Sequence, residues 1–121
     1  MSAGVYNFIL NQGTDHKFTL NYVDGQGTAI DITGKSFRGE IRLNMSDSEP
    51  LAEMEINVIN AVQGELEVKI PAAETENKRL PSTNYDDYVN AVYDIEMTDD
   101  STGDVTRLVH GNIEISPEVT R

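Results

Sequence analysis

The chain has 121 residues, the size of one domain, and carries 9 Lys and Arg against 21 Asp and Glu, for a formal net charge of −12. It contains no cysteine, which excludes disulfides, cysteine-ligated metals and thiol nucleophiles. The negative charge argues against binding to the phosphates of a nucleic acid, and no apolar run is long enough to span a membrane.

The first two predicted strands lie in residues 6–10 and 18–22. Apolar side chains recur at every second position in both segments, which is the period of a half-buried strand. Glycines at residues 24–27 and 33–34 then supply turns, because glycine adopts a positive φ with little strain.

Three further strands are predicted in residues 37–43, 52–58 and 66–70. Apolar side chains alternate there with mostly charged ones. A helix, with its period of 3.6 residues, would place those charges on its buried side. The short segment 60–64 between the last two runs has the length of a hairpin loop.

One short helix is predicted within residues 71–80. Pro71 suits a first helical turn, and Glu74 suits the positive N-terminal end of a helix. Lys78 and Arg79 suit the negative C-terminal end, and the proline that follows the segment ends it. We expect one or two helical turns at a corner of the fold.

The last two predicted strands lie in residues 91–97 and 105–115, joined by a turn at residues 99–104. Arg107 falls within the apolar stripe of the final strand. A charged residue at a buried position is unfavourable, so we predict a bulge or a change of sheet within this strand.

Seven or eight short strands with frequent turns predict an all-β chain. We predict a single domain over residues 1–121, an antiparallel immunoglobulin-like β-sandwich of 7–8 strands with one short corner helix. A small barrel is the alternative arrangement.

Catalytic machinery is not predicted. The two histidines, His16 and His110, are interpreted as surface residues of strands, and no Gly-x-Ser-x-Gly elbow is present. Most carboxylates alternate with apolar residues, as on a solvated sheet face. An enzyme would need two carboxylates, or a histidine and a carboxylate, converging in a pocket. We predict no catalytic residue and no cofactor.

The turn between Asp99 and Asp104 is the one segment where a metal ion comes into question. Its spacing does not match the EF-hand pattern, and Asp, Ser, Thr and Gly are ordinary hairpin residues. We predict a plain turn without a metal site and leave cation binding open.

Two tyrosines stand on a polar loop, which makes it the candidate partner contact. Exposed tyrosines with polar neighbours are common in protein interfaces. In the alternative interpretation, one of the tyrosines packs over the end of the sandwich. The candidate residues are Asn84, Tyr85, Asp86, Asp87 and Tyr88.

The charges are segregated along the chain. Residues 44–67 contain six acids and no Lys or Arg, and residues 81–105 contain seven acids and none. One interpretation is mimicry of DNA, in which an acidic surface occupies a nucleic-acid-binding protein. We favour a repulsive, solvated surface that keeps the protein soluble.

Six parts of the sequence, taken in chain order, carry a resemblance to known proteins. They are residues 12–14, 31–34 with 37–42, 68–75, 92–96, 108–113 and 116–121. Together they resemble small β-sandwich structural proteins of tailed phages and prophages, and the pattern is similar to that of the N-terminal domains of upper-baseplate proteins. The chain departs from this pattern by an insertion at residues 81–90, which contains the tyrosine loop, and by Ala91 in place of a tyrosine.

The resemblance implies a non-enzymatic part of the virion. We expect a tail, baseplate or neck component, made in the cytoplasm of the host bacterium, that contacts other virion proteins and forms a homo-oligomer in the particle. A capsid cement protein is the nearest alternative. An acidic DNA-mimic inhibitor is the alternative from a different class.

Overall fold

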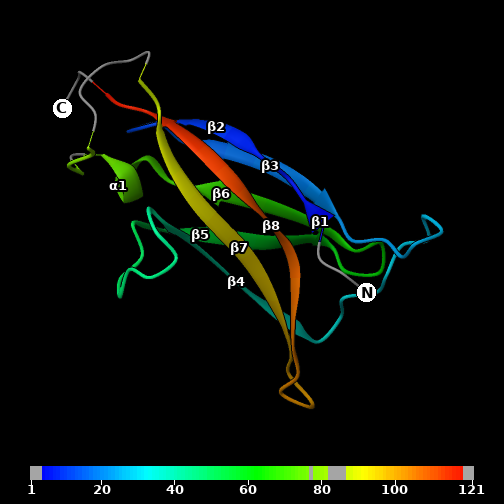
Figure 1. Cartoon of the computed structure of the whole chain (residues 1–121). Coiled ribbons are helices and arrows are strands. Elements are labelled where there is room, and N and C mark those ends of the chain that lie inside the picture. The colour runs from blue at the N-terminus through cyan, green and yellow to red at the C-terminus, as the bar shows by residue number, and fades with distance from the viewer. Residues whose placement is uncertain (1–3, 77, 82–86, 119–121) are drawn as a thin grey trace.

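The computed structural model describes residues 4–76, 78–81 and 87–118. These residues form eight strands and one helix of four residues (Figure 1). The prediction of an all-β chain with one short corner helix is confirmed. The elements are β1 (Gly4–Val5), β2 (Phe8–Asn11), β3 (His16–Asn21), β4 (Lys35–Arg42), β5 (Ala52–Asn60), β6 (Glu65–Ile70), α1 (Ala72–Thr75), β7 (Val89–Asp99) and β8 (Val105–Ser116).

The strands form one curled open sheet in the order β1–β8–β7–β4–β5–β6–β3, and β2 also pairs with β8. All neighbours are antiparallel except β1 and β2, which run parallel to β8. Strand β5 changes partner along its length: residues 52–54 pair with β4, and residues 55–60 pair with β6. This change turns the sheet, and aromatic side chains of β2 and β3 contact each other across its interior.

The core consists of the inward side chains of the alternating strands. Strand β6 has the pattern most clearly, because every second residue is buried and those between are half-buried. The two ends of β5 differ, since Ala52 and Met54 are buried but Val58 is 44% exposed. The largest fully buried side chains are Leu10, Ile32, Ile41, Leu66, Val68, Ile70, Thr75, Ile95, Ile113 and Ile115.

The predicted irregularity in the final strand is a bulge at Leu108. Ile95 pairs with Val109, but the next residue, Glu96, pairs with Arg107, so Leu108 has no opposite residue. The bulge reverses the alternation. Leu108 and Val109 are therefore both buried, while the guanidinium of Arg107 stays on the outside.

The corner helix is shorter than the predicted segment, because the backbone is extended at Pro71 and again at Glu76. Pro71 therefore precedes the helix, and Lys78 and Arg79 lie beyond its end. Side chains from other parts of the chain bind its ends. The Ala72 N–H donates to the Asp15 carboxylate at 2.8 Å. The side-chain amide of Gln12 donates to the carbonyl oxygens of Thr75, at 3.0 Å, and Lys78, at 2.7 Å. The turn is thus held by two side chains of the β2–β3 loop.

The N-terminal strands approach β8 closely at one glycine. The Tyr6 N–H donates to the His110 carbonyl at 3.1 Å, and the Asn112 N–H donates to the Asn7 side-chain oxygen at 2.8 Å. Between these bonds, a Cβ at Gly111 would overlap the Tyr6 carbonyl oxygen. The connection from β1 to β2 therefore requires glycine at this position.

Candidate interaction surfaces

The predicted contact loop is described only at its end. Asn84, Tyr85 and Asp86 lie outside the described residues. Asp87 and Tyr88 are both exposed, Tyr88 to 42%. They line a shallow hollow of about 350 Å³ together with residues of the β4–β5 loop. Tyr88 is thus accessible at the surface.

His16 is not the surface residue that the sequence analysis predicted. Its ring stacks on Phe8, with centroids 4.8 Å apart and planes 7° from parallel. Its Nε2 is buried and has no hydrogen-bond partner among the described residues. Burial lowers the pKa of this imidazole below its usual value. Alternation along β3 could not reveal this, because the stacking partner belongs to a strand that β3 does not pair with.

His16 belongs to an aromatic cluster that holds the N-terminal strands against β3. The ring centroid of Phe8 lies 5.2 Å from the ring centroid of Phe18 and 5.3 Å from that of Tyr93. The Tyr93 hydroxyl donates to the Tyr6 carbonyl at 2.6 Å. Burial raises the pKa of Tyr93, and the neighbouring Tyr6 raises it further. The cluster joins the two edges of the curled sheet through side chains.

The half-buried imidazole of His16 predicts a loss of stability in mild acid. The folded state favours neutral His16, so the unfolded state binds more protons once the pH falls below about 6.5. We expect the urea midpoint of the wild type to fall between about pH 7.5 and 5.5. A His16→Phe variant should lose less over this range, and His110→Gln should behave like the wild type. Equal pH dependence of the wild type and His16→Phe would contradict this assignment.

A polar hollow of about 510 Å³ on the outer face of the sheet brings together Glu40, Asp94 and His110. The three residues lie in one row across the strands, with Glu40 opposite Asp94 and Asp94 opposite His110. This is the kind of convergence that an enzyme would need, and sequence alternation could not place it.

Arginines neutralise the carboxylates of this hollow. Glu40 lies 2.8 Å from Arg42 and 3.5 Å from Arg38, and Asp94 lies 3.4 Å from Arg107. The hydrogen bond from Arg42 lowers the pKa of Glu40, which is the wrong direction for a proton donor at neutral pH. The arrangement favours an exposed network of ion pairs over acid–base catalysis.

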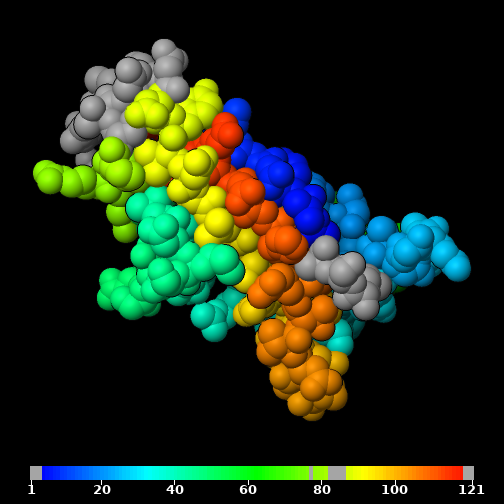
Figure 2. All heavy atoms as spheres, in the orientation of Figure 1, coloured from blue at the N-terminus to red at the C-terminus, as the bar shows by residue number. Residues whose placement is uncertain are grey.

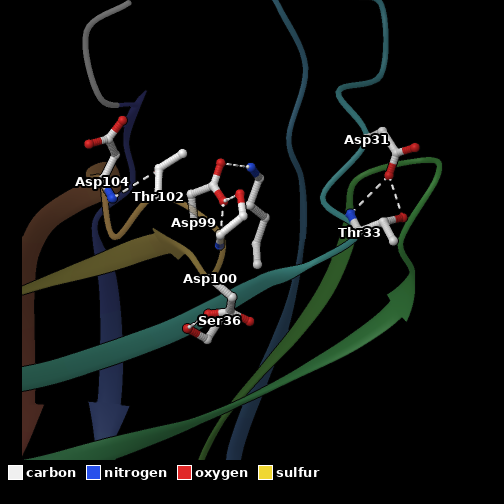
Figure 3. A network of polar contacts seen from close by, with 9 residues as sticks. Asp31, Thr33, Ser36, Asp99, Asp100, Thr102 and Asp104 are labelled. Atoms are coloured by element: carbon white, nitrogen blue, oxygen red, sulfur yellow. Dashed lines mark hydrogen bonds and ion pairs between the residues drawn. The ribbon is translucent and has the colours of Figure 1, made fainter.

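The tip of the β7–β8 hairpin projects from the body of the molecule (Figure 2, orange). The Asp99 carboxylate accepts hydrogen bonds from Lys35, at 2.6 Å, and from the Ser101 hydroxyl and N–H, while the Ser36 hydroxyl donates to Asp100 (Figure 3). The bond from Lys35 and those from Ser101 hold the pKa of Asp99 well below its usual range. Within the described ranges, no group of His, Asp or Glu side chains could hold a metal ion.

An apolar groove of about 590 Å³ opens between β1 and β3. Val5 and Tyr6 line one side, and Phe18, Leu20 and Tyr22 line the other. Alternation in the sequence identifies strands but does not show which strand edges remain unpaired, so this groove was not predicted. One feature of the sequence does mark its position: residues 16–23 contain no carboxylate, in a chain with 21 of them.

Comparisons with known proteins identify no family. No family model matches the chain, and no curated protein matches it either. Among the described residues, no helix is long and apolar enough to cross a membrane. A functional assignment therefore depends on the surfaces described above and on the resemblance of the sequence segments.

Proposed function

We propose that the chain is a non-enzymatic structural protein of a phage virion, a component of the tail, baseplate or neck that acts through protein–protein contacts. The observation that carries the proposal is the apolar groove beside the open edge of β3. Exposed apolar surface next to an unpaired strand is typical of sites of protein association. The resemblance to small virion proteins supports a place in a phage particle. A capsid cement protein is the nearest alternative role in such a particle.

The immunoglobulin-like sandwich is part of this proposal. The change of partner within β5 supports it, because a strand that pairs with different neighbours at its two ends forms the corner between two packed layers. A sheet scaffold of this kind can present loops and edges in fixed positions in repeated copies of a particle.

The acidic DNA mimic remains the candidate from a different class. A mimic needs a continuous negative stripe, but Arg38, Arg42 and Arg107 lie among the carboxylates of the outer face. Binding of a mimic to its target would also weaken strongly with salt, because exposed charges are screened. The ion-paired face therefore favours the structural role.

Co-sedimentation with purified particles tests the proposal. We expect the wild type to sediment with particles from the cells that encode it, at a fixed ratio to the other virion proteins. Recovery only in the soluble lysate, together with salt-sensitive capture of a DNA-binding protein, would overturn the structural role in favour of the mimic.

The tyrosine loop gives a sharper form of this test. A Tyr85→Ser, Tyr88→Ser double variant should keep its melting temperature, because the described Tyr88 is exposed, but enter particles less. Val62→Ser is a matched control, since Val62 is 62% exposed on the β5–β6 loop, which does not line the hollow beside Tyr88. A collapse of stability in the double variant would place the tyrosines in the core and exclude the contact role.

A further inference from the structure

We propose that two copies of this chain associate through their β3 edges, forming one continuous antiparallel sheet around a twofold axis at Thr19. The inference rests on the proposed function, because it names the first partner in an assembly that acts through protein contacts.

One edge of β3 has free backbone groups. Strand β3 pairs with β6 on one side, and none of the described strands pairs with its other side. The Tyr22 N–H donates to Gly64, at the start of β6, so alternate residues before it point the same way. The N–H and C=O groups of Lys17, Thr19 and Asn21 therefore point away from β6, toward the open edge.

The composition of this edge protects it at only one position. Isolated edge strands are usually guarded by charges, prolines or bulges, which prevent pairing with other chains. Lys17 is a charged residue of β3, but residues 18–23 contain no charged residue, no proline and no glycine, and the β3–β6 pairing has no bulge. An edge with this single charge can pair with another strand where the charge meets a suitable partner.

The charges around β3 select a second copy as the partner. Lys17 lies directly opposite Lys69 on β6, an unfavourable like-charge pair, and Asn21 lies opposite Glu65. A twofold axis at Thr19 places Lys17 opposite Asn21 of the second copy, with that copy's Glu65 on the next strand. Lys17 of each copy then lies near Glu65 of the other copy, and the twofold axis produces this contact twice in each dimer.

The groove adds apolar contacts to this pairing. Phe18, Leu20 and Tyr22 face it and are only half-buried in the single chain. The same register places Phe18 opposite Leu20 of the second copy, on the side of the sheet that faces the groove. Cross-strand aromatic–aliphatic pairs of this kind stabilise antiparallel sheets.

The first test is the mass in solution, by size-exclusion chromatography with light scattering. We expect twice the chain mass of 13.4 kDa, falling toward 13.4 kDa on dilution. Lys17→Glu should shift the protein to the monomer, because the introduced carboxylate would lie near Glu65 of the second copy. It should not unfold the chain, because the carboxylate would lie opposite Lys69 and replace a like-charge pair with a favourable one. Adding Glu65→Lys should restore the dimer by exchanging both charges.

Cysteine cross-linking tests the position of the axis, and the absence of native cysteine makes it unambiguous. Thr19→Cys should form a disulfide-linked dimer on mild oxidation, because residues directly opposite in a hydrogen-bonded pair have Cα atoms about 5.5 Å apart. Asn57→Cys is the matched control. It is also exposed and lies in the same row of the sheet, two strands away, with Glu67 between it and Thr19.

Three outcomes would overturn the inference. They are a monomer at every concentration, a dimer unaffected by Lys17→Glu, and cross-linking of Thr19→Cys no faster than that of Asn57→Cys. None of these bears on co-sedimentation with particles. A chain that enters particles but never pairs through β3 would therefore refute this inference while leaving the proposed function intact.

Discussion

Replacing Gly111 with alanine is expected to lower the free energy of unfolding by about 2–3 kcal/mol, the upper part of the range typical of overpacking. The added Cβ would overlap the carbonyl oxygen of Tyr6 and press on the side chain of Asn7. Backbone cannot yield as a flexible side chain can, so the segment joining β1 to β2 would move away from β8. Urea denaturation monitored by circular dichroism measures the effect.

Gly25→Ala is the matched control for this substitution. A Cβ at Gly25 meets no atom within 4 Å, so the free energy of unfolding should change by less than about 0.5 kcal/mol. If both variants lose the same stability, the effect is a general consequence of replacing glycine, and the close approach of Tyr6 has no special role.

The second large effect is expected at Gln12, a buried polar residue that joins three parts of the chain. Its amide donates to the carbonyls of Thr75 and Lys78, and its side-chain oxygen accepts from the Glu118 N–H at 3.1 Å. Gln12→Leu removes all three bonds and leaves buried polar groups without this partner. The free energy of unfolding should therefore fall by about 2–3 kcal/mol. The melting temperature and the urea midpoint should both fall.

Two further variants separate this network from simple packing. Gln63→Leu changes an exposed glutamine and should be nearly neutral. Thr75→Val removes the hydroxyl that accepts the Gly13 N–H at 2.9 Å, and its effect should not add fully to that of Gln12→Leu, because both act on the same corner. Full additivity would indicate that the two bonds are independent.

The sequence was sufficient for most of the strands but not for their neighbours. The exception is the N-terminus, where the predicted strand at residues 6–10 is β2 (Phe8–Asn11) and the separate short strand β1 (Gly4–Val5) was not predicted. Alternation at positions such as Leu66, Val68 and Ile70 identifies a strand and its buried face, because it depends on that strand alone. Even the bulge at Leu108 was detectable, from Arg107 in the apolar stripe. The partners of a strand depend on contacts with residues far away along the chain, which no local pattern encodes.

The same limit applies to the candidate sites. The row of Glu40, Asp94 and His110 comes from three strands, so their convergence follows from pairing register. His16 was assigned to the surface because its own strand gives no sign of Phe8. The groove beside β3 exists because one edge is left unpaired. Each of these features is a property of the order of the strands in the sheet.

The parallel pairing of β1 and β2 with β8 has a consequence for biosynthesis. The first strands of the sheet find their backbone partners only in residues 109–116, close to the other end of the described chain. During translation, Phe8 and Leu10 must therefore wait for their partners until residues 109–116 have left the ribosome. Contacts between such distant residues slow folding, so the sheet can be completed only after β8 has been synthesised.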